Sequence, residues 1–488
     1  MRSRQLTFVF ADSPRGGKGA RPTDESAGKA YLLHRAKGMP TSDLIAPAAD
    51  TSRLLEQVAS ESNLATALLN VARNKGAPGV DGQSVVEVVE FAPLLLPRLR
   101  RALLEGDYGP GDIRRVWIPK PGGGQRGLGI PNVIDRWVQQ AVLQIVEPIF
   151  EPTFHDSSHG FRPHRGAHTA IAEAKTYVGD GYEVVVDLDL SKFFDRVHHQ
   201  RLLARLGQRI ADPRILKLIR QMLKANVVMP DGTRVSTDEG TPQGGPLSPL
   251  LSNVVLDEFD SELQRRGLRF VRYADDCNIF VRSLRAGQRV MASIRRFLER
   301  RLRLQVNEEK SKVARPEEIH FLGFHLRMAP EGKVEVHISA RSKDRLDARI
   351  QELTPRNWGQ SPAACITEVN RYLQGWIAYF RICTEESEFL FRRFDAHIRR
   401  RLRAIFVRQK KRPRYLFRHL LQCDVSPGAA AQAAYCRRGA WYKSNTRGLT
   451  QAYPNAWFHE RLVSLWISWE QFNQPPKLAS GQTLLFEI

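Results

Sequence analysis

Three aspartates at two separate places in the chain have the types and surroundings that phosphoryl-transfer chemistry requires. Asp189 lies at the end of the β-branched run 182–190 (YEVVVDLDL), which is typical of a buried central strand. Asp275 and Asp276 lie within 270–282 (FVRYADDCNIFVR), which predicts two short strands joined by a tight acidic turn. Carboxylates held by a strand end and a hairpin tip of one sheet can bind two Mg²⁺ ions about 3.5–4 Å apart. The pattern therefore indicates two-metal phosphoryl transfer.

The acidic turn has a simpler interpretation when it is considered alone. Aspartate is common in turns because of its local hydrogen bonding, and short motifs often match by accident. Asp187 adds an ambiguity, since it shares the face of Asp189 by the period of two along a strand. The chemical interpretation therefore depends on further motifs in a fixed order.

The surrounding sequence predicts an α/β catalytic part over about 54–335 and a mostly helical part after it. Strands are expected at 113–119, 182–190, 270–282 and 319–326. Helical periodicity begins at Leu54 and returns at 94–104, 134–150 and 287–303. Residues 1–53 are rich in Gly, Pro, Ser, Arg and Ala, so we expect them to be largely disordered.

The charge balance points to a polyanionic partner. The 488 residues include 74 Lys and Arg against 52 Asp and Glu, a net charge of +22. No apolar run is long enough to span a membrane, and the N-terminal apolar stretch is too short for a signal peptide, so we expect a cytoplasmic protein. The five cysteines form no CxxC pair, which argues against a zinc ribbon or a disulfide framework. The expected partner is nucleic acid.

One segment concentrates this positive charge. Residues 392–418 hold 12 Lys or Arg and a single acid, Asp395. Apolar residues recur there at spacings of three and four, which predicts a helix with one core face and one cationic face. Charge runs are often only solvated surfaces, but a face with almost no acids favours phosphate binding.

The ordered motifs resemble those of bacterial group II intron-encoded reverse transcriptases, the maturase family. The segments 189–195 (DLSKFFD) and 273–276 (YADD) are similar to its two catalytic motifs. The nucleotide-pocket motif lies between them at 240–252 (GTPQGGPLSPLLS). Further similar blocks are 118–121 (IPKP) with Arg126, 158–163 (SHGFRP), 307–312 and 321–324 (FLGF). The resemblance runs through about residues 63–470 and implies a right-hand polymerase.

The resemblance also implies a role for each matching residue. Asp189, Asp275 and Asp276 would be the catalytic metal ligands, with the Leu190 carbonyl as a further ligand and two Mg²⁺ ions, for which Mn²⁺ can substitute. The residues expected to bind the incoming dNTP are Lys120, Arg126, Phe194, Gln243 and Lys310. Phe194 would exclude a 2′-hydroxyl group, although it also suits a core position, in which case Phe193 is the next candidate.

The same resemblance divides the chain into domains. Fingers and palm would cover 54–335, an all-α thumb and maturase domain 336–425, and a DNA-binding-like region 426–488, with no endonuclease pattern. Intron RNA would be bound by Arg392, Arg393, Arg399, Arg400, Arg401, Arg403, Lys410, Lys411 and Arg412.

The expected function is reverse transcription of a group II intron together with assistance in its splicing. The partners would be intron RNA, an RNA template, a DNA primer or target, and dNTPs, while the oligomeric state stays open. Two alternatives remain: a free-standing, domesticated relative acting in DNA repair or defence, and an RNA-binding splicing factor without polymerase activity. The second alternative is disfavoured by the intact Asp189, Asp275 and Asp276.

Overall fold

The computed structural model describes residues 25–36, 50–119, 123–355, 359, 361–384 and 387–473. Its chain divides into two compact units. The first contains residues up to Ala174 and Tyr182–Ala314, and the second contains Lys175–Gly181 and the residues from Arg315 onward.

The first unit contains a four-stranded antiparallel sheet with the strand order β6-β7-β3-β8. The strands are β3 (Val184–Leu188), β6 (Arg269–Tyr273), β7 (Asp276–Val281) and β8 (Lys312–Ala314). β3 pairs with β7 on one side and with β8 on the other, and its valines are buried on both faces of the sheet, as its β-branched sequence predicts. The expected central strand and acidic hairpin are both confirmed.

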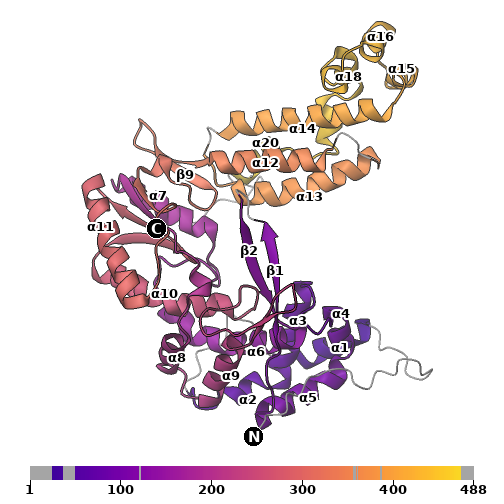
Figure 1. The fold of residues 1–488 in the computed structure, drawn as a ribbon. Coiled ribbons are helices and arrows are strands. Elements are labelled where there is room, and N and C mark those ends of the chain that lie inside the picture. The colour runs from indigo at the N-terminus through magenta and orange to yellow at the C-terminus, as the bar shows by residue number, and fades with distance from the viewer. Residues whose placement is uncertain are drawn as a thin grey trace, which may run out of the picture. The chain divides into compact units, whose positions relative to one another are not determined.

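Helices make up most of the rest of the first unit (Figure 1). They are α1 (Glu25–Ala36), α2 (Leu54–Val58), α3 (Glu61–Arg73), α4 (Val85–Glu90), α5 (Ala92–Glu105), α6 (Val133–Phe150), α7 (Ala167–Gly179), α8 (His199–Gly207), α9 (Pro213–Leu223), α10 (Ser248–Arg265) and α11 (Leu284–Phe297). Short turns of 3-10 helix cover Glu151–Thr153 and Phe193–Asp195, and a π-helical turn covers Leu298–Leu302.

Helix α1 departs from the expected disorder of residues 1–53. It packs against α3, α4 and α5, and Leu32 is completely buried there. Gly28 permits the approach, because a Cβ atom at this position would lie 2.1 Å from the carbonyl oxygen of Val89. The prediction of disorder is therefore wrong for 25–36, while 1–24 and 37–49 lie outside the described residues.

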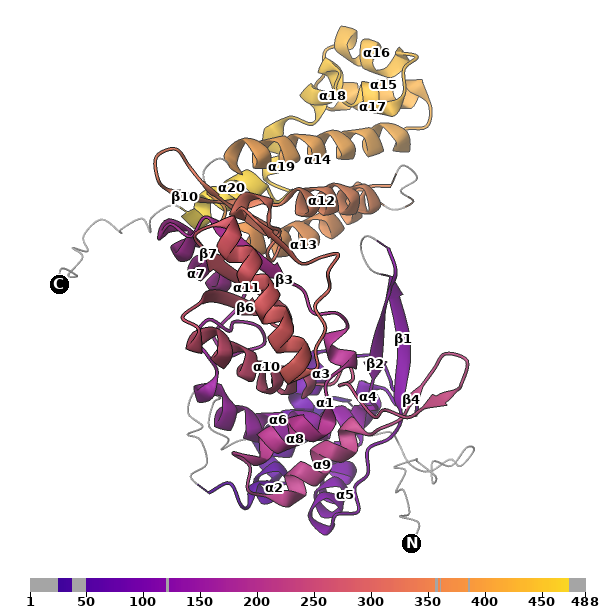
Figure 2. The same cartoon turned by 60° about the vertical axis from the view of Figure 1, so that its left-hand side comes forward.

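A β-hairpin extends from the helices of the first unit (Figure 2). Its strands are β1 (Ile113–Pro119) and β2 (Gln125–Ile130), and β1 also pairs with β4 (Val227–Val228), which pairs with β5 (Arg234–Val235). Lys120, at the predicted triphosphate-binding end of β1, lies outside the described residues.

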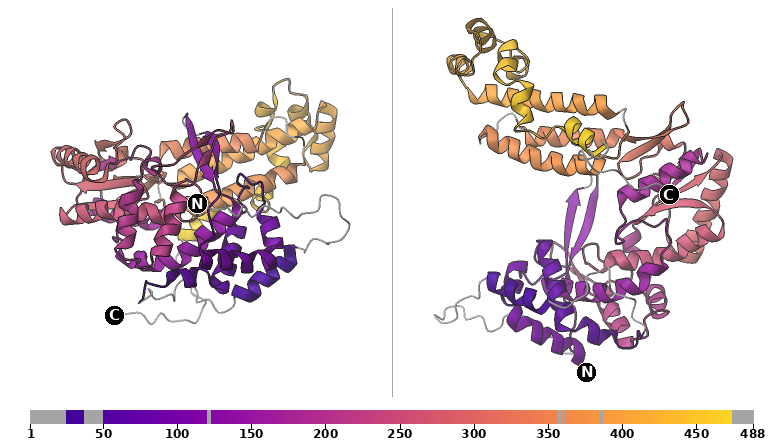
Figure 3. Two further views of the ribbon diagram at one scale, coloured as in Figure 1. Left: turned by 60° about the horizontal axis from the view of Figure 1, so that its bottom comes forward. Right: turned by 180° about the vertical axis from the view of Figure 1, so that it is seen from behind.

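The second unit is mostly helical, as predicted for the chain after about residue 340 (Figure 3). It contains the hairpin β9 (Phe324–Met328) and β10 (Val334–Ile338), a 3-10 turn (Pro316–Glu318), and helices α12 (Ala340–Leu353), α13 (Pro362–Phe380), α14 (Ser387–Gln409), α15 (Pro413–Gln422), α16 (Pro427–Tyr435), α17 (Ala440–Lys443), α18 (Arg447–Ala452), α19 (Asn455–His459) and α20 (Leu465–Asn473). Helices α12, α13 and α14 lie side by side, and α15, α16 and α18 enclose a small core of their own. No helix in the described part of the chain is both long and apolar enough to cross a lipid bilayer.

The hairpin β9–β10 groups with the second unit, whereas we expected it within a first domain ending at residue 335. The expected strand at 319–326 is also shorter and later, because Pro316 starts a 3-10 turn and Phe324 begins the paired segment. The structural division therefore lies at Ala314 and Arg315.

Candidate active site

The three predicted aspartates lie at the same edge of the central sheet. Leu188 of β3 is opposite Cys277 of β7, so Asp189 and Asp276 follow at the next position of this register. Tyr273 and Asp276 pair across the turn, which leaves Ala274 and Asp275 at its tip. The antiparallel pairing of β3 with β7 therefore brings together carboxylates that are far apart in the sequence.

The backbone of Asp189 is anchored by the segment after α11. Its carbonyl oxygen accepts from Asn307 N at 2.8 Å, and its N–H donates to Ser311 Oγ at 3.0 Å. Leu190 makes a bridge to Val306 beside it, and its side chain is buried. The predicted block 307–312 thus supports the position of Asp189, while a metal-binding role of the Leu190 carbonyl stays a prediction.

The electrostatic surroundings of the aspartates favour a bound cation. Asp276 keeps an exposed surface, yet the protein around its carboxyl group limits hydration, and this effect, with repulsion from Asp275 and Asp189, raises its pKa to about 7. Burial, followed by the charge of Asp189, also raises the pKa of Asp275. Clustered carboxylates of this kind are hard oxygen ligands that suit Mg²⁺.

Lys310 forms an ion pair with Asp189. Its Nζ lies 3.3 Å from Asp189 Oδ2, and most of its side chain is exposed. In the part of the chain that the structure describes, no three His, Cys, Asp or Glu side chains adopt the close arrangement of a formed metal site. The three aspartates therefore lie near one another, but their carboxyl groups do not have the close spacing of metal ligands. Lys310 balances part of their charge.

A cavity of about 630 Å³ opens beside Asp275 in the first unit. Three predicted dNTP-binding residues line it: Arg126 from β2, Phe194 from the turn after β3, and Gln243 from the loop before α10. Gln243 is held through its carbonyl oxygen, which accepts from Gly129 N at 3.0 Å. The structure thus brings these side chains to one cavity with Asp275, whereas Lys310 is not among its lining residues.

Glycine is required next to Gln243. Gly244 has a φ of +145°, and a Cβ atom there would lie 2.5 Å from the carbonyl oxygen of Gly129. Gly244 therefore allows this loop to lie directly against β2.

Sequence reasoning missed two large side chains of the cavity, Phe161 and Arg136. Phe161 has a φ of +59° and is 48% exposed, an unusual combination for an aromatic residue. Its block, 158–163, was noted as a motif without a role. Arg136 gave no signal, because it lies in an ordinary amphipathic helix pattern.

The predicted RNA-binding residues of the second unit have different surroundings. Arg392, Arg393, Lys411 and Arg412 are exposed, while Arg399, Arg400, Arg401 and Lys410 are half-buried. Arg392 and Arg400 stack over the indole rings of Trp466 and Trp441, at 4.2 and 4.0 Å from the ring centroids.

Arg401 and Arg403 also make hydrogen bonds within the protein. Arg403 is 7% exposed and donates to the carbonyl oxygen of Tyr453 through Nε and Nη2, and burial lowers its pKa to about 10. Arg401 donates to Thr354 Oγ1 and to the Thr354 carbonyl oxygen. Arg403 therefore lies mostly in the core of the unit, and its contact with RNA stays a prediction.

Comparisons with known proteins show the family to which the chain belongs. Residues 118–326 match the family model "Reverse transcriptase (RNA-dependent DNA polymerase)", and residues 343–423 match "Group II intron, maturase-specific domain". The chain is 36% identical to Protein YkfC of Escherichia coli over 307 residues, which is 55% of this chain and 80% of YkfC. It is 29% identical to the group II intron-encoded protein LtrA of Lactococcus lactis over 353 residues, covering 59% of this chain and 58% of LtrA.

A solved structure, the partial Cas6-RT-Cas1–Cas2 complex, is similar at 22% identity and a TM-score of 0.32, covering 50% of this chain and 42% of that chain. This likeness is too distant to inform the site. The fold and the family matches together define a reverse transcriptase joined to a maturase domain. The chain belongs to the family of group II intron-encoded reverse transcriptases and maturases.

Proposed function

We propose that this chain copies RNA into DNA with two Mg²⁺ ions bound by Asp189, Asp275 and Asp276. The observation that carries the proposal is the convergence of these aspartates at one sheet edge, beside a cavity lined by Arg126 and Gln243. Such ions, when bound, lower the pKa of the attacking 3′-hydroxyl group and neutralise charge on the triphosphate. Mn²⁺ can take the same place, and the Leu190 carbonyl is a further ligand.

Neighbouring residues bind and orient the nucleotide in this proposal. Arg126, with Lys120 at the end of β1, binds the triphosphate through charge. Gln243 borders the base and sugar, and Phe194 occupies the space that a 2′-hydroxyl group would need. Lys310, whose Nζ is 3.3 Å from Asp189, gives a proton to the departing pyrophosphate.

The second unit binds intron RNA. This binding aids splicing, and the bound RNA is the template that is copied during retrohoming. This part of the proposal is supported by the maturase-specific domain match at 343–423 and by the similarity to LtrA. The exposed cations Arg392, Arg393, Lys411 and Arg412 would contact phosphates, and residues 426–473 would contact a DNA primer or target.

Primer extension on an RNA template tests the catalytic assignment. Asp275→Asn keeps the size of the side chain but removes its charge, so DNA synthesis should fall at least about 10³-fold. The affinity for RNA should stay within about twofold of native, because Asp275 is not among the exposed cations proposed to contact RNA. The matched control is Asp238→Asn, an exposed acid in the same unit that does not line the cavity. Near-native synthesis by Asp275→Asn would refute the assignment.

A further inference from the structure

The turn that carries Asp275 and Asp276 has a backbone conformation that needs support. Ala274 has a φ of +57°, a left-handed conformation that residues with side chains rarely adopt. Such conformations persist where surrounding contacts hold them, and they are frequent at functional sites. The contacts of Ala274 therefore show what fixes the catalytic turn.

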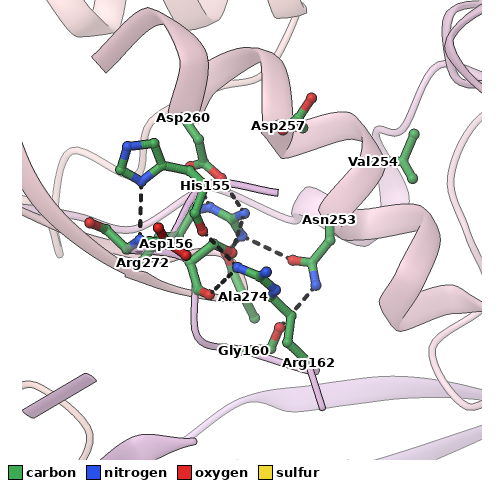
Figure 4. Close-up of polar contacts among 12 residues, drawn as sticks. His155, Asp156, Gly160, Arg162, Asn253, Val254, Asp257, Asp260, Arg272 and Ala274 are labelled. Carbon is green, nitrogen blue, oxygen red and sulfur yellow. Dashed lines mark hydrogen bonds and ion pairs between the residues drawn. The ribbon is translucent and has the colours of Figure 1, made fainter. Parts of the chain in front are cut away.

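Arg272, two residues before the turn centre, supplies one of these contacts (Figure 4). Its side chain is completely buried, and its Nη1 donates to the carbonyl oxygen of Ala274 at 2.9 Å and to Asn253 Oδ1 at 3.1 Å. Nη2 donates to Ser158 Oγ at 2.7 Å, and Nε and Nη2 donate to the two carboxylate oxygens of Asp260 at 2.7 and 2.5 Å. All five guanidinium hydrogens thus have partners.

The partners of Arg272 are themselves fixed in the core. Asp260, Asn253 and Ser158 are each completely buried, and the first two lie on α10. Because both come from one rigid helix, they hold the guanidinium plane in a single orientation. A buried ion pair alone contributes little net stability. The additional hydrogen bond from Arg272 to the Ala274 carbonyl oxygen instead fixes the position of the turn.

The segment 157–160 supports the turn from a second side. It runs parallel to β6, with Arg272 N donating to the Ser157 carbonyl oxygen at 2.8 Å and His159 N donating to the Arg272 carbonyl oxygen at 2.9 Å. Asn253 Nδ2 donates to the carbonyl oxygen of Gly160 at 2.9 Å. A Cβ atom on Gly160 would lie 2.3 Å from Ala274 N, so this backbone contacts the turn directly.

We infer that Arg272 is a positioning residue of the polymerase site, which together with Asn253, Asp260 and the segment 157–160 fixes the turn that carries Asp275 and Asp276. The inference rests on the proposed function, and it gives a role to the motif 158–163. Phe161, which lines the cavity, is also part of this assembly. It directly follows Gly160, whose carbonyl oxygen accepts a hydrogen bond from Asn253.

The test compares Arg272→Lys with the native chain in steady-state dNTP incorporation on an RNA template. Lysine keeps the positive charge beside Asp260 but lacks the planar fork, so it cannot hold the Ala274 carbonyl as well. We expect kcat to fall about 10- to 100-fold, with KM for dNTP and the affinity for template–primer within about threefold of native.

Arg205→Lys is the matched control. Arg205 also pairs with acids of α10, Asp257 and Glu258, and donates to the carbonyl oxygen of Val254, but it does not contact the turn. This variant should keep native kcat, whatever its effect on thermal stability. If Arg205→Lys loses kcat as much as Arg272→Lys does, Arg272 acts only through general stability, and the inference is overturned.

Gly160→Ala keeps the inference testable if Arg272→Lys does not fold. The added methyl group displaces the turn without disturbing a buried charge, so kcat should again fall with KM for dNTP nearly unchanged. Native kcat in a folded Gly160→Ala protein, or in folded Arg272→Lys, would overturn the inference. An inactive native chain would instead refute the proposed function, so the two failures are distinguishable.

Discussion

Phe193 and Phe194 are adjacent in sequence but differ in burial. Phe193 is 2% exposed and belongs to the core, whereas Phe194 lines the cavity beside Asp275. The preceding residue, Lys192, has a φ of +51°, and the 3-10 turn that follows points the two rings in different directions, in an edge-to-face contact. This turn brings Phe194 to the cavity, so Phe194 stays the candidate for the sugar contact.

Replacing Phe194 should change the choice of sugar. In Phe194→Val the cavity gains the space that a 2′-hydroxyl group needs, so the preference for dNTP over rNTP should fall at least about tenfold. Single-nucleotide incorporation with both substrates measures this ratio. The control is Phe193→Leu, which changes the core and should leave the ratio native. An unchanged ratio in Phe194→Val would reduce Phe194 to a packing residue.

At the residue scale, the sequence indicates the candidate metal ligands more clearly than the residues that position them. Asp189, Asp275 and Asp276 stand in recognisable motifs, because their chemistry demands fixed types at fixed spacing. Arg272 has no such signal, since its partner Ser158 is 114 positions away in the chain. Which buried acid a buried arginine meets depends on tertiary packing, and no local pattern records it.

The strands and helices with strong periodicity were predictable at the element scale. β3 and the hairpin β6–β7 follow from β-branched runs around an acidic turn, and α3, α5 and α6 follow from apolar periodicity. The strands β4 and β5 have two residues each, which is too short for a periodic pattern. They form because β4 pairs with β1 and β5 pairs with β4. Helix α1 was missed because its surroundings have the composition of disorder.

Asp395 shows how one acid within the basic segment organises an element. Its carboxylate accepts from Ser464 Oγ at 2.6 Å, from Leu465 N at 2.9 Å and from Trp466 N at 3.2 Å. These N–H groups begin α20, which cannot satisfy them internally. The single acid of 392–418 is therefore a helix cap joining α14 to α20, a role that charge counting did not suggest.

Asp395→Ala should destabilise the second unit by about 2 kcal/mol, because it leaves buried donors at the start of α20 unpaired. Urea unfolding, followed by tryptophan fluorescence, measures this change through Trp466 and Trp469. Glu388→Gln is the control on the same helix, since its pair with Arg392 is exposed and worth less than about 1 kcal/mol. Equal stability of the two variants would contradict the capping role.

At the scale of the whole molecule, each unit has a different chemical character. The first holds the three aspartates and the cavity beside Asp275, and the second presents exposed cations along and after α14. The net charge of +22 is therefore not only a matter of solubility. A reaction that joins polyanions needs concentrated negative charge only at the metal site and positive charge elsewhere.

The exposed cations Arg392, Arg393, Lys411 and Arg412 should make RNA binding depend on salt concentration. Removing two phosphate contacts with the double variant Lys411→Gln, Arg412→Gln should lower the log–log salt slope by about 1.4–1.8. The control is Arg98→Gln, Arg101→Gln, which removes the same charge from exposed positions on α5. A slope that changes equally in both double variants would indicate a net-charge effect without a defined binding surface.

The central claim is that Asp189, together with the turn aspartates, holds the metal ions that copy RNA into DNA. The most direct measurement is the rate of DNA synthesis on a primed RNA template by Asp189→Asn and Asp187→Asn. Each substitution removes one acid in or directly after β3. Asp187 lies within the sheet, opposite Asn278 and Lys312, two residues before Asp189. We predict a loss of at least about 10³-fold for Asp189→Asn and less than about tenfold for Asp187→Asn. Near-native synthesis by Asp189→Asn, or an equal loss in both variants, would contradict the account.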